Sequence, residues 1–386
     1  MNIRDPKIIV VGAGFYGAVM AERMATDLAE PVLIIDSREH LGGNSWSEAD
    51  PETGIECHLY GSHIFHTKDE IVWRYISRFA SLNHYRHRVL SIHNNAVYPM
   101  PVNLTTLEGL YGRRFTPEEA KTFLKSETDS LSGEPQNLEE MANKQVGAKV
   151  YDAFLKGYTW KQWGTDPRQL PASTITRLPV RFSYKSDYFD DPYQGIPMGG
   201  YGDVFKRILS HPKITTILGL DFFSIRGLLN PDAIVIYTGP VDRYFDYKFG
   251  VLGWRTLKFE KECVPVTDYQ GNSVINYPDL DIPYTRIHEF RHYHPERNYI
   301  EGKSVIFKEY SRACGVSDSP YYPINTPEDQ RKMNLYQVAC AAEPRTIFGG
   351  RLGEYRYLDM DKTIGAALKA YIDVFIPRWR GINHAK

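Results

Sequence analysis

The chain of 386 residues is long enough for about two to three domains of roughly 150 residues each. It carries 46 Lys and Arg against 47 Asp and Glu, so its net charge of -1 provides no overall field for nucleic acid or for an anionic membrane surface. With 42% hydrophobic and 24% charged residues, the composition excludes extensive disorder. The 27 tyrosines outnumber the 18 phenylalanines, which favours a large polar ligand as well as core packing.

The cysteines and the apolar segments bear on the cellular compartment. The four cysteines lie far apart, at positions 57, 263, 314 and 340, and form no CxxC pair, so the sequence predicts neither a disulfide framework nor a cysteine zinc site. The first apolar stretch is too short for a signal peptide, and none approaches the roughly 18 residues of a membrane span. We therefore expect a cytoplasmic protein without a membrane-spanning helix.

The chain begins with a strand, a glycine-rich turn, a helix and a second strand. Residues 7–11 (KIIVV) and 31–36 (PVLIID) predict strands buried on both faces, because their apolar runs do not alternate with polar residues. Between them, GAGFYG (12–17) leads into a helix that extends to about residue 28. This βαβ context makes the glycine pattern a dinucleotide-binding fingerprint.

The residue types of the fingerprint have physical reasons. Gly12 permits the tight turn, Gly14 removes the Cβ that would block a pyrophosphate, and Gly17 lets the helix and the strand pack closely. Backbone N–H groups and the helix dipole would then face the phosphates. Asp36, at the end of the second strand, is placed to accept hydrogen bonds from ribose hydroxyls. NAD and FAD share this fingerprint, so later segments have to distinguish them.

Those later segments favour FAD. GGN (42–44) soon after the second strand lets the backbone approach an extended FAD again, as in flavoproteins. Residues 232–240 and 346–353 predict two further strands, and a helix from Asp359 to about Phe375 would direct its first N–H groups at the ribityl chain or the pyrophosphate. A second GxGxxG is absent from the sequence, so a separate nicotinamide domain is not predicted.

The middle of the chain is predicted to be helical between Asn103 and about Gly164. Thr116 is an N-cap before Pro117 and two acids, and Asn137 resembles the cap of a capping box. Helices over about 137–146 and 148–158 follow.

Residues 246–325 instead predict a sheet. Strand-like pieces lie at Val264–Asp268, Ser273–Asn276 and Ser304–Glu309, separated by Gly and Pro. The proline-interrupted segment 165–179 leaves a helix and is predicted to be a mobile lid.

These elements predict an α/β protein with a Rossmann-like FAD-binding domain, an inserted helical domain and a twisted antiparallel β-sheet domain. The expected boundaries are 1–82, 195–245 and 338–386 for the FAD-binding domain, 103–176 for the helical domain, and 83–102, 177–194 and 246–337 for the substrate-binding sheet domain.

Two groups of histidines suggest a metal at first sight. Cys57, His58, His63 and His66 lie close in sequence, and His288, His292 and His294 form HxxxHxH; neither spacing matches a standard zinc pattern, so we predict no metal.

An aromatic segment, YDAFLKGYTWKQW (151–163), places Phe154 and Tyr158 on one helical face, a pattern typical of core packing unless a ligand lies there. Two arginines and several tyrosines elsewhere would suit a diphosphate, because Arg supplies a charged fork and Tyr a directed donor. These are Arg177, Arg286, Tyr188, Tyr322 and Tyr357.

From about Lys7 to Phe375 the chain resembles the bacterial type of UDP-galactopyranose mutase. The resemblance rests on several long segments in order: GAGFYG, GGN, HLYGSHIFHT, FLKGYTWKQWG, LPASTITRLPVRF, IPYTRIHE, KEYSRAC, SPYYPI and GRLGEYRYLDMD. It implies an isomerase that uses FAD, active when reduced, to interconvert UDP-galactopyranose and UDP-galactofuranose for cell-surface polysaccharide, without net oxidation. Members often dimerise, so a homodimer is expected beside the UDP-sugar, with neither nucleic acid nor membrane as a partner.

The resemblance also assigns residues. Catalytic roles fall on Arg177, Arg286 and His63. Cofactor-binding positions are Gly12, Gly14, Gly17, Asp36, Arg38, Gly43, Asn44, Gly61, Ser62, Arg351, Asp359, Met360 and Thr363. Substrate-binding positions are Phe154, Tyr158, Trp163, Arg177, Tyr188, Asn276, Arg286, Tyr322, Tyr357 and Asp359. Two positions depart from the family pattern, because Ser62 stands where Pro is usual and Gly202 where Thr is usual.

The expected reaction opens and recloses a sugar ring, which requires that the bond from C1 to UDP break. Reduced FAD, with an electron-rich N5, would be the nucleophile at C1, and the arginines would stabilise the departing UDP. Three other functions share part of the sequence signal: a mutase for another nucleotide sugar, an amine-oxidase-like FAD oxidoreductase, and a non-enzymatic carrier like the GDP-dissociation inhibitors.

Overall fold

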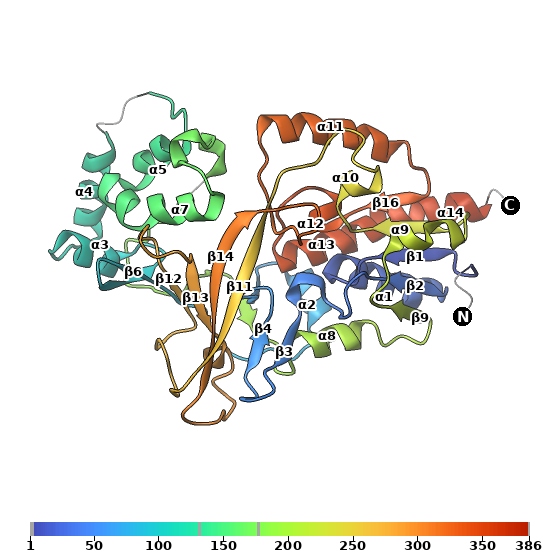
Figure 1. The fold of residues 1–386 in the computed structure, drawn as a ribbon, viewed down its shortest axis with the longest axis horizontal. Coiled ribbons are helices and arrows are strands. Elements are labelled where there is room, and N and C mark those ends of the chain that lie inside the picture. Colours follow the sequence, from blue (N-terminus) through green and yellow to red (C-terminus); the bar gives the residue numbers. More distant parts are fainter. Residues whose placement is uncertain (1–3, 130–132, 176–177, 385–386) are drawn as a thin grey trace.

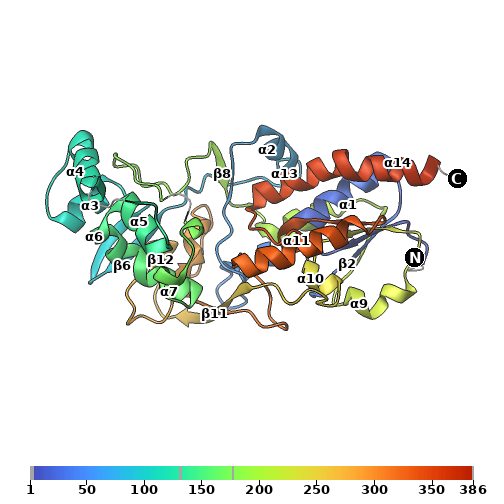
Figure 2. The same ribbon diagram turned by 90° about the horizontal axis from the view of Figure 1, so that it is seen from above.

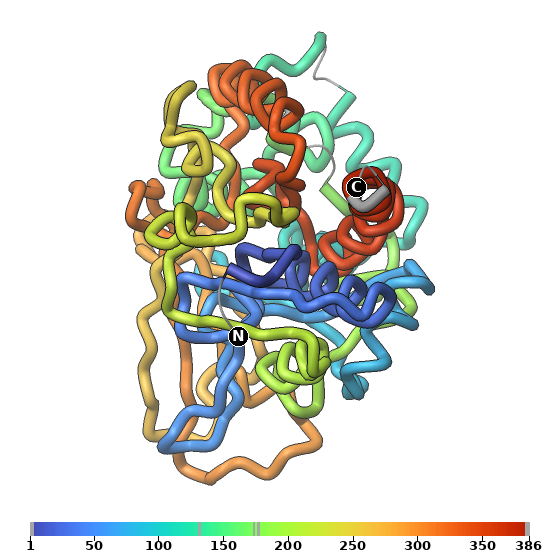
Figure 3. Tube along the Cα trace, turned by 90° about the vertical axis from the view of Figure 1, so that its right-hand side faces the viewer, coloured from blue at the N-terminus to red at the C-terminus, as the bar shows by residue number. Residues whose placement is uncertain are grey.

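The structure is a computed structural model that describes residues 4–129, 133–175 and 178–384. Two large sheets dominate it, and Figure 1 shows them along the long axis, with the N- and C-terminal segments together at one end and the helices of the middle segment at the other. Both ends of the described chain lie near the first sheet, and Figure 3, which looks along the long axis, shows the C-terminal helix α14 end-on.

The first sheet is parallel and joins strands from distant parts of the chain. In the order β16-β10-β1-β2-β9 it contains Thr346–Phe348, Ile234–Tyr237, Ile8–Val11, Val32–Ile35 and Ile214–Ile217. Every residue of β1 and β2 is buried, which confirms the two buried strands predicted near the start. β9 was not predicted from the sequence.

Helices cover both faces of this sheet, because alternate residues of each strand point to opposite sides. Ile8 and Val10 of β1 pack with α1 (Phe15–Leu28), α8 (Gly200–Ile208) and α13 (Met360–Ala370). Ile9 and Val11 face the other side. The further helices of this end of the molecule are α2 (Glu70–Ile76), α9 (Phe222–Ile225), α10 (Val241–Tyr244), α11 (Pro327–Ala341), α12 (Gly350–Gly353) and α14 (Ile376–His384). Seen from above in Figure 2, α1, α11, α13 and α14 run in nearly the same direction.

The second sheet has seven strands in the order β15-β11-β14-β13-β12-β6-β7. They span Tyr322–Pro323, Trp254–Val264, Ser304–Ala313, Arg286–Glu289, Val274–Asn276, Val89–His93 and Ala96–Met100. Every pairing is antiparallel except that of β12 with β6, which is parallel. Two short ribbons complete the strands: β3 (Ser47–Ala49) with β4 (Glu56–His58), and β5 (Phe65–Thr67) with β8 (Tyr193–Gly195).

The inserted helices follow the predicted caps. They are α3 (Leu104–Tyr111), α4 (Pro117–Asp129), α5 (Leu138–Val146), α6 (Ala148–Val150), a π-helical turn over Tyr151–Leu155 and α7 (Lys156–Trp163). Thr116 Oγ1 accepts from the Glu119 N–H at 3.3 Å while the Glu119 carboxylate accepts from the Thr116 N–H at 2.8 Å. The Asn137 side chain accepts from the Glu140 N–H at 3.0 Å. Both predicted caps are confirmed.

Three predicted boundaries are wrong. The strand expected over 346–353 ends at Phe348, and Gly350–Gly353 form the helix α12. The strand expected over Val264–Asp268 ends at Val264, because Pro265 has no N–H for the ladder, and the strand lies upstream as β11. The last helix does not end near Phe375: a π-helical turn over Tyr371–Phe375 leads directly into α14, so the helix passes Pro377.

Within the described part of the chain, none of the helices is both long and apolar enough to span a membrane.

The glycine turn gives a paired prediction. A Cβ on Gly17 would lie 2.0 Å from the Gly12 carbonyl oxygen, a backbone atom that cannot move aside, whereas a Cβ on Gly14 meets no atom within 4 Å. We expect Gly17→Ala to lower the free energy of unfolding by about 1–3 kcal/mol or more, as overpacking does. Urea denaturation measures it. Gly14→Ala is the matched control and should unfold like the wild type; equal losses in the two variants would contradict this account of the turn.

Candidate functional site

A cavity of about 430 Å³ opens at the carboxyl ends of β1, β2 and β10. We call it the glycine-turn cavity. The predicted cofactor residues that line it are Gly12, Gly14, Asp36, Arg38, Gly43, Asn44, Arg351, Met360 and Thr363. Gly17 lies beneath the turn, against the Gly12 carbonyl, so its role is in packing. The crevice outside the carboxyl ends of parallel strands is where open α/β sheets bind ligands.

Asp36 organises the turn from the end of β2. Its Oδ2 accepts from the Ala13 N–H at 2.7 Å and its Oδ1 from the Arg38 N–H at 2.8 Å. The carboxylate thereby ties the glycine turn to the segment after β2. Each oxygen has a second lone pair and the residue lines the cavity, so the ribose contact expected of Asp36 stays a prediction.

Arg38 supplies an uncompensated donor at the wall of this cavity. Its guanidinium lies 4.5 Å from the centre of the Tyr60 ring, and Nη2 donates to Asn44 Oδ1 at 2.8 Å and to Ser319 Oγ at 3.2 Å. Nη1 is buried and makes no hydrogen bond to any described residue. A buried donor without an acceptor is costly, so this atom points to an oxygen-bearing ligand. The site therefore fits a dinucleotide such as FAD.

A second cavity, of about 680 Å³, lies between the second sheet and α7, and we call it the arginine–tyrosine cavity. The predicted residues that line it are Gly61, Ser62, His63, Phe154, Tyr158, Trp163, Tyr188, Asn276, Arg286, Tyr322, Arg351, Tyr357, Asp359 and Met360. Asn44, His63, Arg351 and Met360 line both cavities, so the two meet.

Arg286 is the charged centre of the arginine–tyrosine cavity. Its Nη2 donates to the Tyr158 hydroxyl, and its Nε lies 3.4 Å from Glu309 Oε1. Asn276 lies directly opposite Arg286 in the β12–β13 register, and its Oδ1 is buried without a hydrogen-bond partner among the described residues. A cation, a phenol and an unpaired amide oxygen thus converge on one end of the cavity.

Ser62 belongs to a chain of hydrogen-bonded side chains, between His288 and Tyr293. Glu309 Oε2 accepts from His288 Nε2 at 2.9 Å, and Ser62 Oγ lies 2.5 Å from His288 Nδ1 and also bonds the Tyr293 hydroxyl. Burial opposes ionisation of Glu309, but the Arg286 charge and the His288 hydrogen bond outweigh it and hold the pKa of Glu309 below its usual value.

These states fix the direction of the hydrogen bonds. An ionised Glu309 only accepts, so His288 Nε2 carries a proton, and burial lowers the pKa of His288. His288 Nδ1 is then an acceptor for the Ser62 hydroxyl, and Tyr293 donates to Ser62. The Ser62 hydroxyl therefore has two buried partners.

His63 stands where the two cavities meet. Its Nδ1 lies 2.7 Å from the Gly61 carbonyl oxygen, which can only accept, so Nδ1 carries the proton and Nε2 is left as an acceptor. Burial lowers the pKa of His63 to about 4. His63 is therefore a neutral imidazole at neutral pH.

Aromatic residues also line the arginine–tyrosine cavity. The rings of Tyr322 and Tyr357 are stacked with centroids 5.8 Å apart, and the Arg351 guanidinium lies 4.6 Å from the Tyr357 ring centre. The Tyr357 hydroxyl donates to Asp359 Oδ1 at 2.9 Å. Tyr188 and Tyr357 are 40% and 49% exposed, so both residues are accessible to a ligand that enters from solvent.

Phe154 has both of the roles considered for the aromatic segment, core packing and contact with a ligand cavity. It is buried in a core cluster, edge-on to Tyr98 with ring centroids 5.0 Å apart, and it also lines the cavity. Arg177 lies outside the described residues, so its predicted position at the diphosphate and on a lid stays a prediction.

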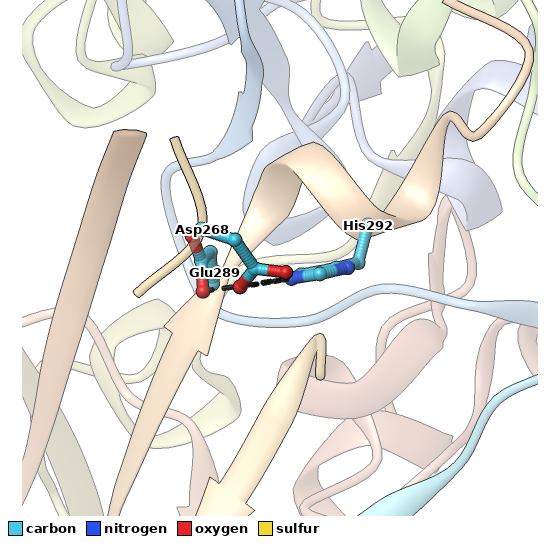
Figure 4. Close-up of side chains that lie close together, drawn as sticks. All are labelled: Asp268, Glu289 and His292. Atoms are coloured by element: carbon cyan, nitrogen blue, oxygen red, sulfur yellow. Dashed lines mark hydrogen bonds and ion pairs between the residues drawn. The ribbon is translucent and has the colours of Figure 1, made fainter. Parts of the chain in front are cut away.

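The histidines of HxxxHxH are held by different acids. His288 pairs with Glu309, and His294 with Glu296 at 2.7 Å. Asp268, Glu289 and His292 form a group whose ligand atoms lie within 4.8 Å of one another, drawn in Figure 4.

The hydrogen bonds of this group give it a structural role. Glu289 accepts the backbone N–H groups of Tyr269 and Gln270, both at 2.9 Å. Burial opposes protonation of His292, but Glu289 and Asp268 outweigh it and raise its pKa. The group therefore ties the loop before β12 to the segment after β13.

The arginine–tyrosine cavity is also lined by Tyr60, His87 and Glu309, which are not among the residues predicted from the sequence. Glu309 lies within the KEYSRAC segment, but its importance follows from β13–β14 pairing, which places it directly opposite Arg286. Strand register of this kind is not visible in the sequence.

The geometry defines an α/β protein of the dinucleotide-binding class, with a second, polar ligand cavity that meets the first. A family model described as UDP-galactopyranose mutase matches residues 153–357, and one described as NAD(P)-binding Rossmann-like domain matches residues 10–79. The chain belongs to the UDP-galactopyranose mutase family, and it is an isomerase.

Among curated relatives, a "Probable UDP-galactopyranose mutase" of Klebsiella pneumoniae is 44% identical over 95% of this chain and 94% of its own length. A "dTDP-fucopyranose mutase" of Escherichia coli is 40% identical over 94% of this chain and 97% of its own length. The fold resembles that of a crystal structure of reduced UDP-galactopyranose mutase, with a TM-score of 0.73 and 18% identity, covering 96% of each chain. The predicted fold class and family are confirmed.

Buried His87 beside Arg286 predicts acid sensitivity. Burial, followed by the Arg286 charge, lowers the pKa of His87 to about 3 from the ordinary 6.5. Below pH 6.5 the unfolded chain therefore binds a proton that the folded protein excludes, and the free energy of unfolding falls as the pH drops toward 3. The contribution of His87 is about 1.4 kcal/mol per pH unit, or roughly 2 kcal/mol at pH 5.

Chemical denaturation between pH 5 and 7 measures this slope. His87→Asn keeps an acceptor for the Tyr85 hydroxyl, 3.0 Å from His87 Nδ1, and should show a smaller slope. His84→Asn, at an exposed position, is the control and should keep the wild-type slope. A wild-type slope in the His87 variant would contradict the assignment.

Proposed function

We propose that this protein interconverts UDP-galactopyranose and UDP-galactofuranose, with FAD in the glycine-turn cavity and the UDP-sugar in the arginine–tyrosine cavity. The observation that carries the proposal is the junction of the two cavities at Asn44, His63, Arg351 and Met360 in a chain of the mutase family. A cofactor and a sugar bound in cavities that meet there can react with each other.

The residues of the glycine-turn cavity fit FAD. Gly14 leaves open space where a Cβ would project, and the first turns of α1 and α13 supply N–H groups for phosphates. Arg38 Nη1 and the Asp36 carboxylate remain as a donor and an acceptor for the dinucleotide. Reduced FAD would supply an electron-rich N5 as the nucleophile for the anomeric carbon.

The cavity residues bind and orient the substrate. Arg286 has its charge partly neutralised by Glu309, and a diphosphate would add a second anionic partner for its guanidinium, with Arg177 as the predicted second cation. The hydroxyls of Tyr188, Tyr322 and Tyr357 complete the diphosphate end in this proposal. As UDP departs, its negative charge grows, and the fixed cation stabilises it.

At the nucleotide end, Phe154 and Tyr158 offer aromatic faces to uracil and Asn276 offers an unpaired amide, while Trp163 borders the sugar. His63 has its protonated Nδ1 committed to Gly61, so its Nε2 can accept a hydrogen bond from a sugar hydroxyl at the junction.

The division into FAD-binding, helical and sheet domains at the predicted boundaries is part of this proposal, as are the homodimer and the cytoplasmic location. One specific alternative substrate is a dTDP-fucose, because the 40% identical relative is named a dTDP-fucopyranose mutase. The second alternative function is that of an oxidoreductase, because a putrescine oxidase structure shares the fold at a TM-score of 0.56 and 12% identity.

One experiment separates these functions. Enzyme reduced anaerobically with dithionite is incubated with UDP-galactofuranose or with dTDP-fucofuranose, and the nucleotide sugars are separated by chromatography. We expect conversion of the UDP-sugar by the reduced enzyme, none by the oxidised enzyme, and many turnovers per equivalent of reductant. Preferred conversion of the dTDP-sugar would replace the substrate. An oxidised product formed by the oxidised enzyme in air, with stoichiometric consumption of O2, would indicate an oxidoreductase.

Arg286 provides a test of the diphosphate site. Removing one partner of a buried charge pair costs about 2–5 kcal/mol, so Arg286→Ala should lower kcat/KM by a factor of tens or more. Steady-state kinetics of the reduced enzyme measure it. Arg312→Ala is the control, since that arginine is exposed and its described ion pair is with Asp318, at 2.6 Å. Near-native kinetics in the Arg286 variant would exclude the role.

A further inference from the structure

Lys161 of α7 lies in a ring of main-chain oxygens that none of the roles above uses. Its Nζ donates to the carbonyl oxygens of Asp279 and Ile282 at 2.9 Å, of Tyr284 at 3.0 Å, and of Tyr277. All four carbonyls belong to residues 277–285, which we call the β12–β13 loop. The three ammonium protons are thus shared among four acceptors on a single loop.

Gly157, one helical turn earlier, lets α7 approach the same loop. Residues four apart lie on one face of a helix, so Gly157 and Lys161 face the loop together. A Cβ at position 157 would lie 2.1 Å from the Pro278 carbonyl oxygen, a backbone atom. The face of α7 therefore combines an absent side chain with a cation, and the two together allow direct contact between helix and loop backbone.

The Lys161 ammonium is a positive charge in a partly buried position, where burial makes a charge costly. Burial lowers the pKa of Lys161 to about 8, and the nearby carboxylates of Asp279 and Asp281 act in the opposite direction. Asp279 is itself held from the β6–β7 turn, by His93 Nδ1 at 2.5 Å and by the Asn94 N–H at 3.1 Å. The loop is thus fixed from two sides.

The ring of carbonyls has a direct geometric consequence for the arginine–tyrosine cavity. Asn276 immediately precedes the β12–β13 loop and Arg286 immediately follows it, while α7 carries Tyr158 and Trp163. On the cavity side, the hydrogen bond from Arg286 to Tyr158 also joins β13 to α7. The path of the loop thereby sets where Asn276 and Arg286 stand relative to the aromatic helix.

We propose that Lys161 is a positioning residue for substrate: by fixing the β12–β13 loop on α7, it holds Asn276 and Arg286 against Tyr158 at the nucleotide end of the cavity. The inference rests on the proposed function, in which that end takes the UDP moiety. Every contact of Nζ named above is with the main chain. Lys161 therefore fixes the position of the β12–β13 loop independently of the side chains that the loop carries.

The test uses the FAD-bound enzyme and UDP as the probe. Lys161→Met keeps the length of the side chain and removes the charge, and Gly157→Ala pushes the loop away independently. Lys156→Met is the matched control, five residues earlier on the same helix, where the ammonium is exposed and paired with Asp152 at 3.2 Å. Calorimetry gives the Kd of UDP, kinetics give KM and kcat, and hydrogen exchange reports on peptides covering 277–285 and 8–35.

We expect Lys161→Met and Gly157→Ala each to raise the UDP Kd and the KM tenfold or more while kcat at saturation changes less than threefold. Hydrogen exchange should accelerate in 277–285 and not in 8–35. Lys161→Arg, which keeps the charge, should recover part of the affinity, and Lys156→Met should match the wild type.

A wild-type UDP Kd in either Lys161→Met or Gly157→Ala would overturn the proposal, as would equal acceleration of exchange in both peptides, which indicates a general loss of stability. If Lys161→Met does not fold, Gly157→Ala and Lys161→Arg decide by the same criteria. If the wild-type enzyme itself fails to bind UDP, the proposed function fails; unchanged exchange of 277–285 in Lys161→Met then separately overturns the anchoring of the loop.

Discussion

The buried carboxylate of Glu309 is the constraint on which the arginine–tyrosine cavity depends. A carboxylate that is 2% exposed must be compensated, and Arg286 and His288 compensate it from the neighbouring strand. That requirement fixes the Arg286 guanidinium at the cavity and fixes the proton of His288 on Nε2. Through His288 it also determines the hydrogen bonds of Ser62. One buried charge thereby arranges Arg286 and Ser62 along the arginine–tyrosine cavity.

Main-chain groups do much of the positioning at both ends of the site. At the glycine turn, the Asp36 carboxylate accepts the backbone N–H groups of Ala13 and Arg38. At the β12–β13 loop, the Lys161 ammonium donates to backbone carbonyls. In each case a charged side chain holds a loop by its polar backbone, and glycine permits the close approach. Such contacts fix the path of a loop without restricting which side chains the loop displays.

This arrangement suits a reaction in which most of the substrate does not react. The nucleotide and the diphosphate would be bound by groups held rigidly by sheet, helix and buried charge, while the sugar alone reaches the junction of the cavities. Binding energy from the remote part can then position the reacting carbon. The relatives named for UDP-galactopyranose and for dTDP-fucopyranose differ in both nucleotide and sugar, which is consistent with one scaffold that serves several nucleotide sugars.

The sequence by itself determined the features that depend on neighbouring residues. The βαβ unit with its three glycines and Asp36, and the caps at Thr116 and Asn137, were predicted correctly because turn and cap chemistry is local. Tertiary structure decided the rest. The pairing of Arg286 with Glu309, the ring of carbonyls around Lys161 and the single parallel pair in the second sheet all require segments far apart in the chain to choose partners and register. Those choices are set by packing across the whole fold, and the local pattern of a strand or a helix face does not contain them.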